Sequence, residues 1–309
     1  LPPKVAKSMG ITYKTLHRIT RPVNLSVALG DGEFWSLRPM SKRRAAESVR
    51  ELSDRDASHW YDFVQRMHRF AAILEELYQL APPDIATSAI GEILPMLGVG
   101  RKLRALGRRD MTEFLRVMPM TTQDLLDDTF EHEILKAAIA SKALRDLQQG
   151  PRSGGTTFNL LHYMTSEADK YFGARLWTRQ GPDAYARLAA DIARARGVEI
   201  RTGVRVESID VADHAVRGVT LAGGETIGAR VVVSTADPAR TLLDLVDPVW
   251  LDPEFMLAVQ NIKLRGSTAY VLYALDALSD ADRRFVSSVS LTRDTAALER
   301  AADAAKYGE

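Results

Sequence analysis

The alternation of apolar and polar residues changes along the chain, and these changes predict where strands give way to helices. Between residues 11 and 38 apolar and polar residues alternate, with Gly30-Asp31-Gly32 between two such runs. This alternation is typical of strands with one buried face, and an Asp-Gly pair between them favours a hairpin turn. The sequence therefore predicts a β-hairpin near the start of the chain, after a short helix over residues 1–10.

A helical region is expected after the hairpin. From residue 41 to residue 147 apolar residues recur at the three- and four-residue spacing of a helix face. Hydroxyl side chains that commonly cap helix N-termini precede several of these runs, at Ser41, Ser53 and Thr121 or Thr122. The pattern predicts helices over residues 43–52, 53–80, 87–106, 110–118, 121–128 and 131–147.

The second half of the chain mixes both patterns. Its clearest helix spans residues 183–196, with Pro182 at the start and Gly197 just past the end. The apolar run 231–233 predicts a strand that is buried on both faces. The other expected elements are helices over 156–168, 238–246, 252–261 and 292–306, and strands over 198–200, 204–209, 215–221, 226–229 and 268–275, with a turn at Gly223-Gly224.

Composition limits the class of protein. The 309 residues are 46% hydrophobic and 26% charged, enough to bury a large core in about two domains. With 41 basic and 40 acidic side chains the net charge is +1, so we expect no nucleic-acid partner. No signal peptide is visible and no apolar run approaches the ~20 residues of a membrane-spanning helix, so a soluble cytoplasmic protein is expected.

Searches for catalytic and metal-binding motifs give no match. The absence of cysteine excludes disulfides, thiolate metal sites and a cysteine nucleophile. The six histidines are scattered, Gly98-Val99-Gly100 has Leu103 in place of the third glycine of a dinucleotide fingerprint, and no serine lies in a Gly-x-Ser-x-Gly elbow. We therefore expect no metal site, and the sequence identifies no catalytic residue.

Residues 95–118 form a basic segment in which arginines alternate with apolar residues. Six basic side chains stand against only Asp110 and Glu113. A helix of this kind can lie on an anionic membrane surface with its apolar side at the interface. A protein-packed helix pair with a solvated basic face gives the same pattern. Peripheral membrane contact through this segment is one expectation, and the solvated face is the alternative.

Three consecutive runs carry a family resemblance. They are residues 197–209 (GVEIRTGVRVESI), 218–227 (GVTLAGGETI) and 229–238 (ARVVVSTADP). In this order they resemble the flavoprotein superfamily of amine oxidases and phytoene desaturases, and within it the phytoene dehydrogenase-related oxidoreductases. The likeness extends to residues 241–248 and 261–266, to the Gly150-Pro151 loop and to the hairpin at residues 30–32.

The resemblance implies FAD as cofactor and an α/β (α+β) fold. It implies a partial Rossmann-like FAD/NAD(P)-binding domain with a β-meander, beside a mixed-sheet substrate domain with a large helical insert. We expect a substrate-facing domain over residues 1–175, the middle of the FAD domain over 176–246, and a return to the substrate domain over 247–309. The glycine turn for the FAD pyrophosphate and the segment that closes over the flavin have no match, which suggests the interior of such a protein.

The resemblance also assigns cofactor-binding residues. It places the backbone of Val206 against the adenine, which an extended strand can hold through its N–H and C=O groups. Gly181 lies where the family opens its cofactor helix with Gly-Gly-Met, although Gln180 and Pro182 flank it here. The remaining expected contacts follow the predicted strand 231–233, at the carboxyl edge where ligands of open α/β sheets collect: Ser234, Thr235, Ala236 and Asp237.

By the same resemblance, the function would be hydride transfer from a carbon of an apolar substrate, of isoprenoid or lipid type, to the flavin. We expect the substrate cavity between the strands 11–38 and 268–275 and the helices 53–80 and 156–168. Phe158, His162 and Tyr163 are the expected lining residues. A second hypothesis is a non-enzymatic module of the GDP-dissociation-inhibitor type, which binds a partner and an isoprenoid chain without redox chemistry.

Overall fold

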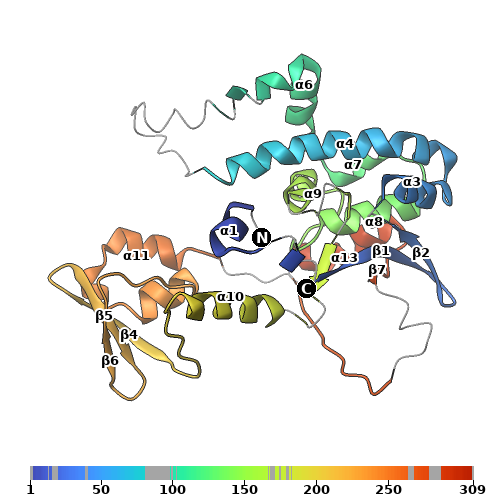
Figure 1. Ribbon diagram of the computed structural model, residues 1–309. Helices are drawn as coiled ribbons and strands as arrows, with labels where there is room; N and C mark the ends of the chain where they lie inside the picture. Colours follow the sequence, from blue (N-terminus) through green and yellow to red (C-terminus); the bar gives the residue numbers. More distant parts are fainter. Residues whose placement is uncertain are drawn as a thin grey trace. The chain divides into compact units, whose positions relative to one another are not determined.

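The chain is described by a computed structural model and forms two compact units (Figure 1). The first unit comprises Leu1–Ala184 with Ser267–Glu309, and the second comprises Tyr185–Gly266. These boundaries lie later in the chain than the expected ones at residues 175 and 246. The structure describes residues 3–12, 14–15, 20–38, 41–80, 98, 100–101, 103–165, 167, 171–173, 175–178, 181, 183–263, 268–277 and 287–307.

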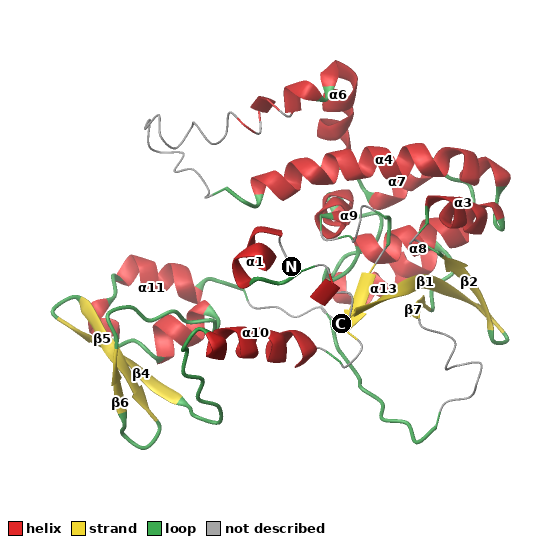
Figure 2. Ribbon diagram, in the orientation of Figure 1, coloured by secondary structure: helices red, strands yellow, loops and turns green. Residues whose placement is uncertain are grey.

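The sheet of the first unit is built around one long strand, β1 (Thr20–Gly30). β1 pairs antiparallel with β2 (Glu33–Leu37) and with β3 (Arg175–Thr178), and parallel with β7 (Ser287–Ser290). The predicted hairpin is confirmed, because β1 and β2 are joined at Asp31 and Gly32, where both residues have positive φ. The unit therefore contains a mixed sheet (Figure 2).

Helices make up most of the remainder of the first unit. Their hydroxyl caps are confirmed at Ser41, Ser53 and Thr121. Each of these side chains accepts a hydrogen bond from the backbone N–H of the third residue in the helix that it precedes. Most of the predicted helix over residues 87–106 lies outside the described residues. The described helices are α1 (Pro3–Met9), α3 (Lys42–Arg50), α4 (Asp54–Leu77), α6 (Gly107–Val117), α7 (Thr122–Asp127), α8 (Glu133–Ala143), α9 (Thr156–Met164) and α13 (Thr295–Tyr307).

An aromatic cluster forms the core beneath α4, which packs against α3 and α9. The Trp60 ring meets Phe172 edge-on at 5.3 Å, and the Phe63 ring meets Phe130 in the same way at 5.0 Å. All four side chains are buried. Burying such a side chain contributes about 1.5–3 kcal/mol, so this cluster is a main source of stability.

A buried carboxylate ties the start of α4 to the start of α8. Asp56 is completely buried and accepts the backbone N–H groups of Glu131 at 2.9 Å and His132 at 3.0 Å. His132 is itself the N-cap of α8, and Glu131 accepts hydrogen bonds from Ser53 and Arg55. The acidic start of this helix therefore has a structural role.

The second unit contains the predicted meander. Strands β4 (Val206–Ala212), β5 (Ala215–Leu221) and β6 (Thr226–Gly228) pair antiparallel in sequence order, and the turn at Gly223-Gly224 has positive φ at both glycines. The helix that leads into this unit, α10 (Asp183–Ala195), also follows the prediction. Beyond the meander lie a π-helical turn (Arg240–Asp244), a 3-10 turn (Pro248–Trp250) and α11 (Pro253–Gln260).

Three strand predictions are wrong. Residues 198–200, 231–233 and 268–275 are not strands, although they have the apolar sequence of strands. Val233 is 84% exposed and Leu272 is 94% exposed, whereas a strand covered on both faces was expected at residues 231–233. A strand requires a hydrogen-bonded neighbour, and among the described residues none of these segments has one. The mixed helix-and-sheet class is confirmed, while a Rossmann-like sheet stays a prediction.

Candidate functional site

The meander has two edge strands, β4 and β6, and the residue expected at the adenine lies on β4. β4 is an outer strand, paired with β5 on one side and with no strand on the other among the described residues. Val206, the residue expected at the adenine, begins this strand and is half-buried. Farther along the edge, the Ile209 N–H donates to the Leu245 carbonyl at 2.7 Å. An edge of this type offers backbone donors and acceptors in fixed geometry, which suits the recognition of a purine.

Residues 234–237 form an exposed turn stabilised by their own hydrogen bonds. The Ser234 hydroxyl accepts the Ala236 N–H at 3.2 Å and lies 2.7 Å from the Thr241 hydroxyl. The Asp237 carboxylate accepts the Arg240 N–H at 2.9 Å and so caps the helical turn that follows. Because the side chains are short and exposed, a bound molecule could approach the backbone closely.

The expected FAD residues are divided between the two units. Val206 and residues 234–237 belong to the second unit, whereas Gly181 belongs to the first. Gly181 has φ of +79°, a conformation that favours glycine, and its carbonyl accepts hydrogen bonds from Thr178 and from the Ala184 N–H. The second unit offers polar groups of the kinds that the adenosine half of FAD requires: backbone groups at a strand edge, the Ser234 and Thr235 hydroxyls, and the Asp237 carboxylate.

The three expected substrate residues lie on α9 and line neither of the two described cavities. The His162 ring nitrogen Nδ1 lies 2.9 Å from the Tyr78 hydroxyl, and burial raises the pKa of Tyr78 above its usual value. The Tyr163 hydroxyl donates to Asp146 at 2.5 Å, and Phe158 is exposed. In the structure these contacts join α9 to the end of α4 and to the loop after α8.

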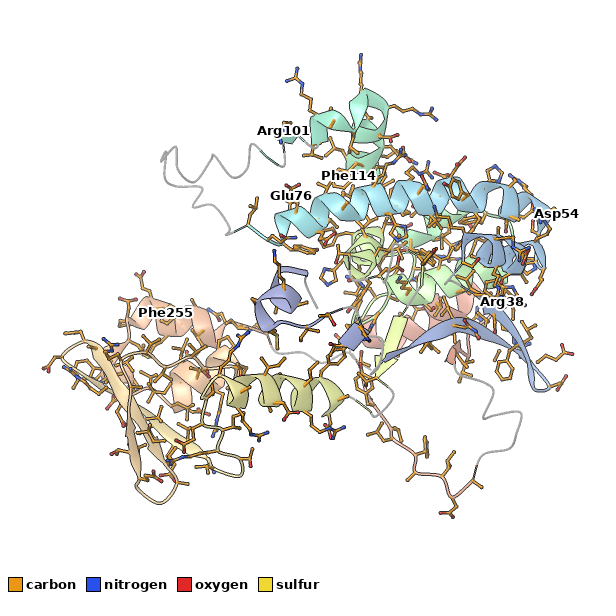
Figure 3. The ribbon with its side chains drawn as sticks, in the orientation of Figure 1. Arg38, Asp54, Glu76, Arg101, Phe114 and Phe255 are labelled. Carbon is orange, nitrogen blue, oxygen red and sulfur yellow. The ribbon has the colours of Figure 1, made fainter. Side chains whose placement is uncertain are left out.

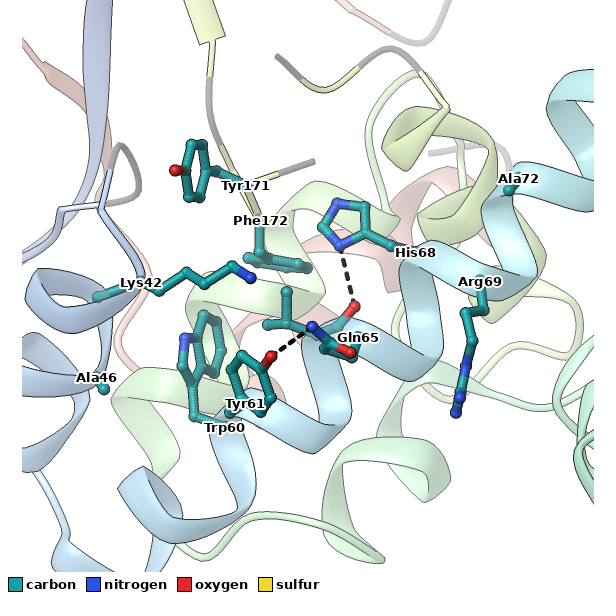
Figure 4. A pocket seen from close by; sticks show the side chains of 12 residues that line it. Lys42, Ala46, Trp60, Tyr61, Gln65, His68, Arg69, Ala72, Tyr171 and Phe172 are labelled. Atoms are coloured by element: carbon teal, nitrogen blue, oxygen red, sulfur yellow. Dashed lines mark hydrogen bonds between the residues drawn. The ribbon is translucent and has the colours of Figure 1, made fainter. Parts of the chain in front are cut away.

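A cavity of about 410 Å³ lies elsewhere in the first unit, between α3, α4 and residues 171–172 (Figure 4). Of the expected cavity walls, only the helix 53–80 is represented among the described lining residues. This cavity was not predicted, and its sequence signal lies in the aromatic pairs Trp60-Tyr61 and Tyr171-Phe172. The lining residues are Lys42, Ala45, Ala46, Trp60, Tyr61, Val64, Gln65, His68, Arg69, Ala72, Tyr171 and Phe172.

A buried ionic network stands behind the cavity wall. Glu167 Oε2 lies 2.7 Å from His68 Nε2, its Oε1 accepts the Gly173 N–H, and Oε1 also pairs with the Lys142 ammonium. His68 Nδ1 faces the Val64 carbonyl at 3.0 Å. Because both ring nitrogens of His68 face acceptors, only the doubly protonated imidazolium donates to both.

Within the part of the chain that the structure describes, no group of three His, Asp or Glu side chains is arranged to hold a metal ion. In the same residues, no helix combines the length and the apolar character needed to cross a bilayer.

Comparison with known proteins defines the class. Residues 35–276 match the family model of the flavin-containing amine oxidoreductases, a match that covers most of the chain. The chain therefore belongs to this family, which uses FAD as its cofactor. This confirms the resemblance and the cofactor that the runs in residues 197–238 predicted.

Similarity to individual proteins agrees with this class. The chain is 28% identical over 243 residues to pyridine nucleotide-disulfide oxidoreductase domain-containing protein 2 of Rattus norvegicus, covering 75% of this chain and 41% of that protein. The Mus musculus protein of the same name is 27% identical over the same shares. A phytoene desaturase (neurosporene-forming) of Cereibacter sphaeroides is 30% identical over 149 residues, covering 46% of this chain and 28% of the desaturase. The chain thus spans about two fifths of the two mammalian proteins.

Proposed function

We propose that this protein is an FAD-dependent oxidoreductase that removes a hydride from a carbon of an apolar substrate of isoprenoid or lipid type. The family match over residues 35–276 carries the proposal, because it extends across both units. The similarity to a phytoene desaturase supports the substrate class. The same match favours an oxidoreductase over the non-enzymatic alternative.

In this proposal the second unit holds the adenosine half of FAD. The outer edge of β4 at Val206 binds the adenine. The turn at residues 234–237 contributes hydroxyl groups, and its short side chains let the cofactor come close to the backbone. When bound, FAD supplies the acceptor for a hydride. The role of the protein is then to orient an apolar substrate and exclude water from it.

Anaerobic spectroscopy tests the substrate class. Phytoene in detergent micelles should bleach the visible flavin bands of the protein isolated from its natural source, because hydride transfer reduces the flavin. Benzylamine, a probe for amine oxidation, should leave the bands unchanged. Bleaching by benzylamine and not by phytoene would contradict an apolar hydrocarbon substrate.

We further propose a peripheral membrane contact through the basic segment, residues 95–118. Among its described residues, Arg101, Arg104 and Arg108 are exposed and form no ion pair, whereas Arg116 pairs with Glu113 and Asp128. Figure 3 shows Phe114 between α6 and α4, where its ring meets Phe70 edge-on at 5.4 Å. Leu115 is 62% exposed on the same segment. Unpaired arginines and an exposed leucine in one segment suit the interface of an anionic bilayer.

Vesicle co-sedimentation tests this contact. Changing Arg101, Arg104 and Arg108 together to Glu should weaken binding to phosphatidylserine-containing vesicles about tenfold or more, since each basic residue near such a surface contributes ~1 kcal/mol. The matched control changes three exposed lysines elsewhere, Lys7, Lys14 and Lys263, to Glu. Equal losses in the two triple variants would show only a net-charge effect and contradict a specific surface.

A further inference from the structure

The cavity of the first unit contains a cation without an acidic partner. Lys42 is the first residue of α3, and its ammonium lies 5.3 Å from the centre of the Tyr61 ring. Among the described residues Lys42 forms no ion pair, whereas Arg69, which also lines the cavity, pairs with Asp110 at 3.0 Å. None of the twelve described lining residues is an Asp or a Glu. The cavity therefore carries uncompensated positive charge at Lys42.

The remainder of the cavity separates polar from apolar groups. Trp60 and Phe172 are buried and form its inner wall, together with Ala45. Toward the exposed side, Gln65 donates a hydrogen bond to the Tyr61 hydroxyl at 2.6 Å. Figure 4 shows Lys42 extending between the Trp60–Tyr61 pair and the Tyr171–Phe172 pair. A ligand here would meet aromatic faces along its length and a cation at one end.

We propose that this cavity binds an apolar carboxylate, a class of ligand that combines one negative charge with a hydrophobic ring or chain. The carboxylate pairs with the Lys42 ammonium, and the apolar part lies against Trp60, Tyr171 and Phe172. A cationic ligand would meet only like charge, and a neutral apolar molecule would leave Lys42 unused. Charge-assisted hydrogen bonds are about twice as strong as neutral ones, so Lys42 sets the preference for an anion. The proposal does not depend on flavin binding.

Calorimetric titration with a pair of matched probes tests the site. The anion is 1-naphthylacetate, and its neutral counterpart of similar shape is 2-(1-naphthyl)ethanol. We expect the protein to bind the anion more tightly, and the Lys42→Gln variant to bind it about tenfold more weakly while its affinity for the alcohol stays the same. Arg43→Gln is the matched control, because Arg43 is the neighbouring exposed cation on α3 and does not line the cavity.

A second variant locates the binding site. Ala72 lines the cavity on α4, and Ala72→Leu fills part of the space with little change in the charge of the site. It should weaken the binding of both probes, with an unchanged melting temperature showing that the fold is kept. Equal loss of the anion in Lys42→Gln and Arg43→Gln, or unchanged binding of both probes to Ala72→Leu, would overturn the proposal.

Discussion

Replacing Glu167 with alanine should lower the free energy of unfolding of the first unit by about 3–5 kcal/mol. The Glu167 side chain is only 3% exposed, and the Lys142 side chain that it pairs with is 7% exposed. The same carboxylate accepts from His68 and from the Gly173 N–H. Removing it takes away the anion that the buried Lys142 ammonium and the His68 ring both contact, and desolvated charge is costly.

Differential scanning calorimetry measures this loss. For a unit of 150–250 residues each 1 kcal/mol corresponds to roughly 2–4 °C in melting temperature, so the expected decrease is about 6–20 °C. The control is Glu75→Ala, which removes an exposed carboxylate from α4 and should change stability by less than about 0.5 kcal/mol. Similar melting temperatures for the two variants would contradict a stabilising role for the buried network.

Gly218→Ala should destabilise the meander of the second unit by about 2–3 kcal/mol. Gly218 lies on the middle strand β5, opposite Asp210 on β4 and Gly228 on β6. A Cβ at this position would overlap the Ile227 carbonyl oxygen and lie 3.0 Å from the Gly228 Cα. Because these are backbone atoms, β6 must move away from β5 to make room. Strand propensity alone predicts the opposite result, since glycine weakens strand interiors.

The cross-strand neighbour provides the control for this prediction. Among the described residues, a Cβ at Gly228 would meet a single atom within 4 Å, the Arg217 carbonyl oxygen at an ordinary 3.9 Å, so Gly228→Ala should be tolerated. Hydrogen exchange at β5 and β6 reports the local stability of both variants. Faster exchange is expected in Gly218→Ala only, and equal exchange in the two variants would show that the close approach at Gly218 does not limit packing.

Features with local causes were predictable from the sequence. The Asp-Gly hairpin, the Ser and Thr caps and the Gly223-Gly224 turn each depend on a few neighbouring residues, and all agree with the structure. The meander is of the same kind, because its three strands follow one another directly. The alternation of apolar and polar residues, together with the glycines of its turn, was sufficient to specify the meander within about 25 residues.

Features that depend on distant partners were not predictable in the same way. β1 pairs with β3 and β7, which lie far away in the chain, and neither short strand was predicted. Conversely, residues 231–233 and 268–275 have strand sequences, and the structure gives them no described partner. An apolar run shows that a segment can be a strand, while hydrogen bonding decides whether it is one.

The candidate sites show the same division. Ser234 and Asp237 are candidates because their order in the sequence matches the family pattern. His68 and Glu167 were missed because they are 99 positions apart, and neither belongs to a recognisable motif. Lys42 was missed for a similar reason: its ring partner Tyr61 is on the next helix, and only folding brings the two together.

The visible absorption spectrum of the protein isolated from its natural source tests the central claim, that this family member is an FAD oxidoreductase. The account predicts the two absorption bands of an oxidised flavin, retained by the protein through gel filtration. A colourless protein that takes up no added FAD would contradict it.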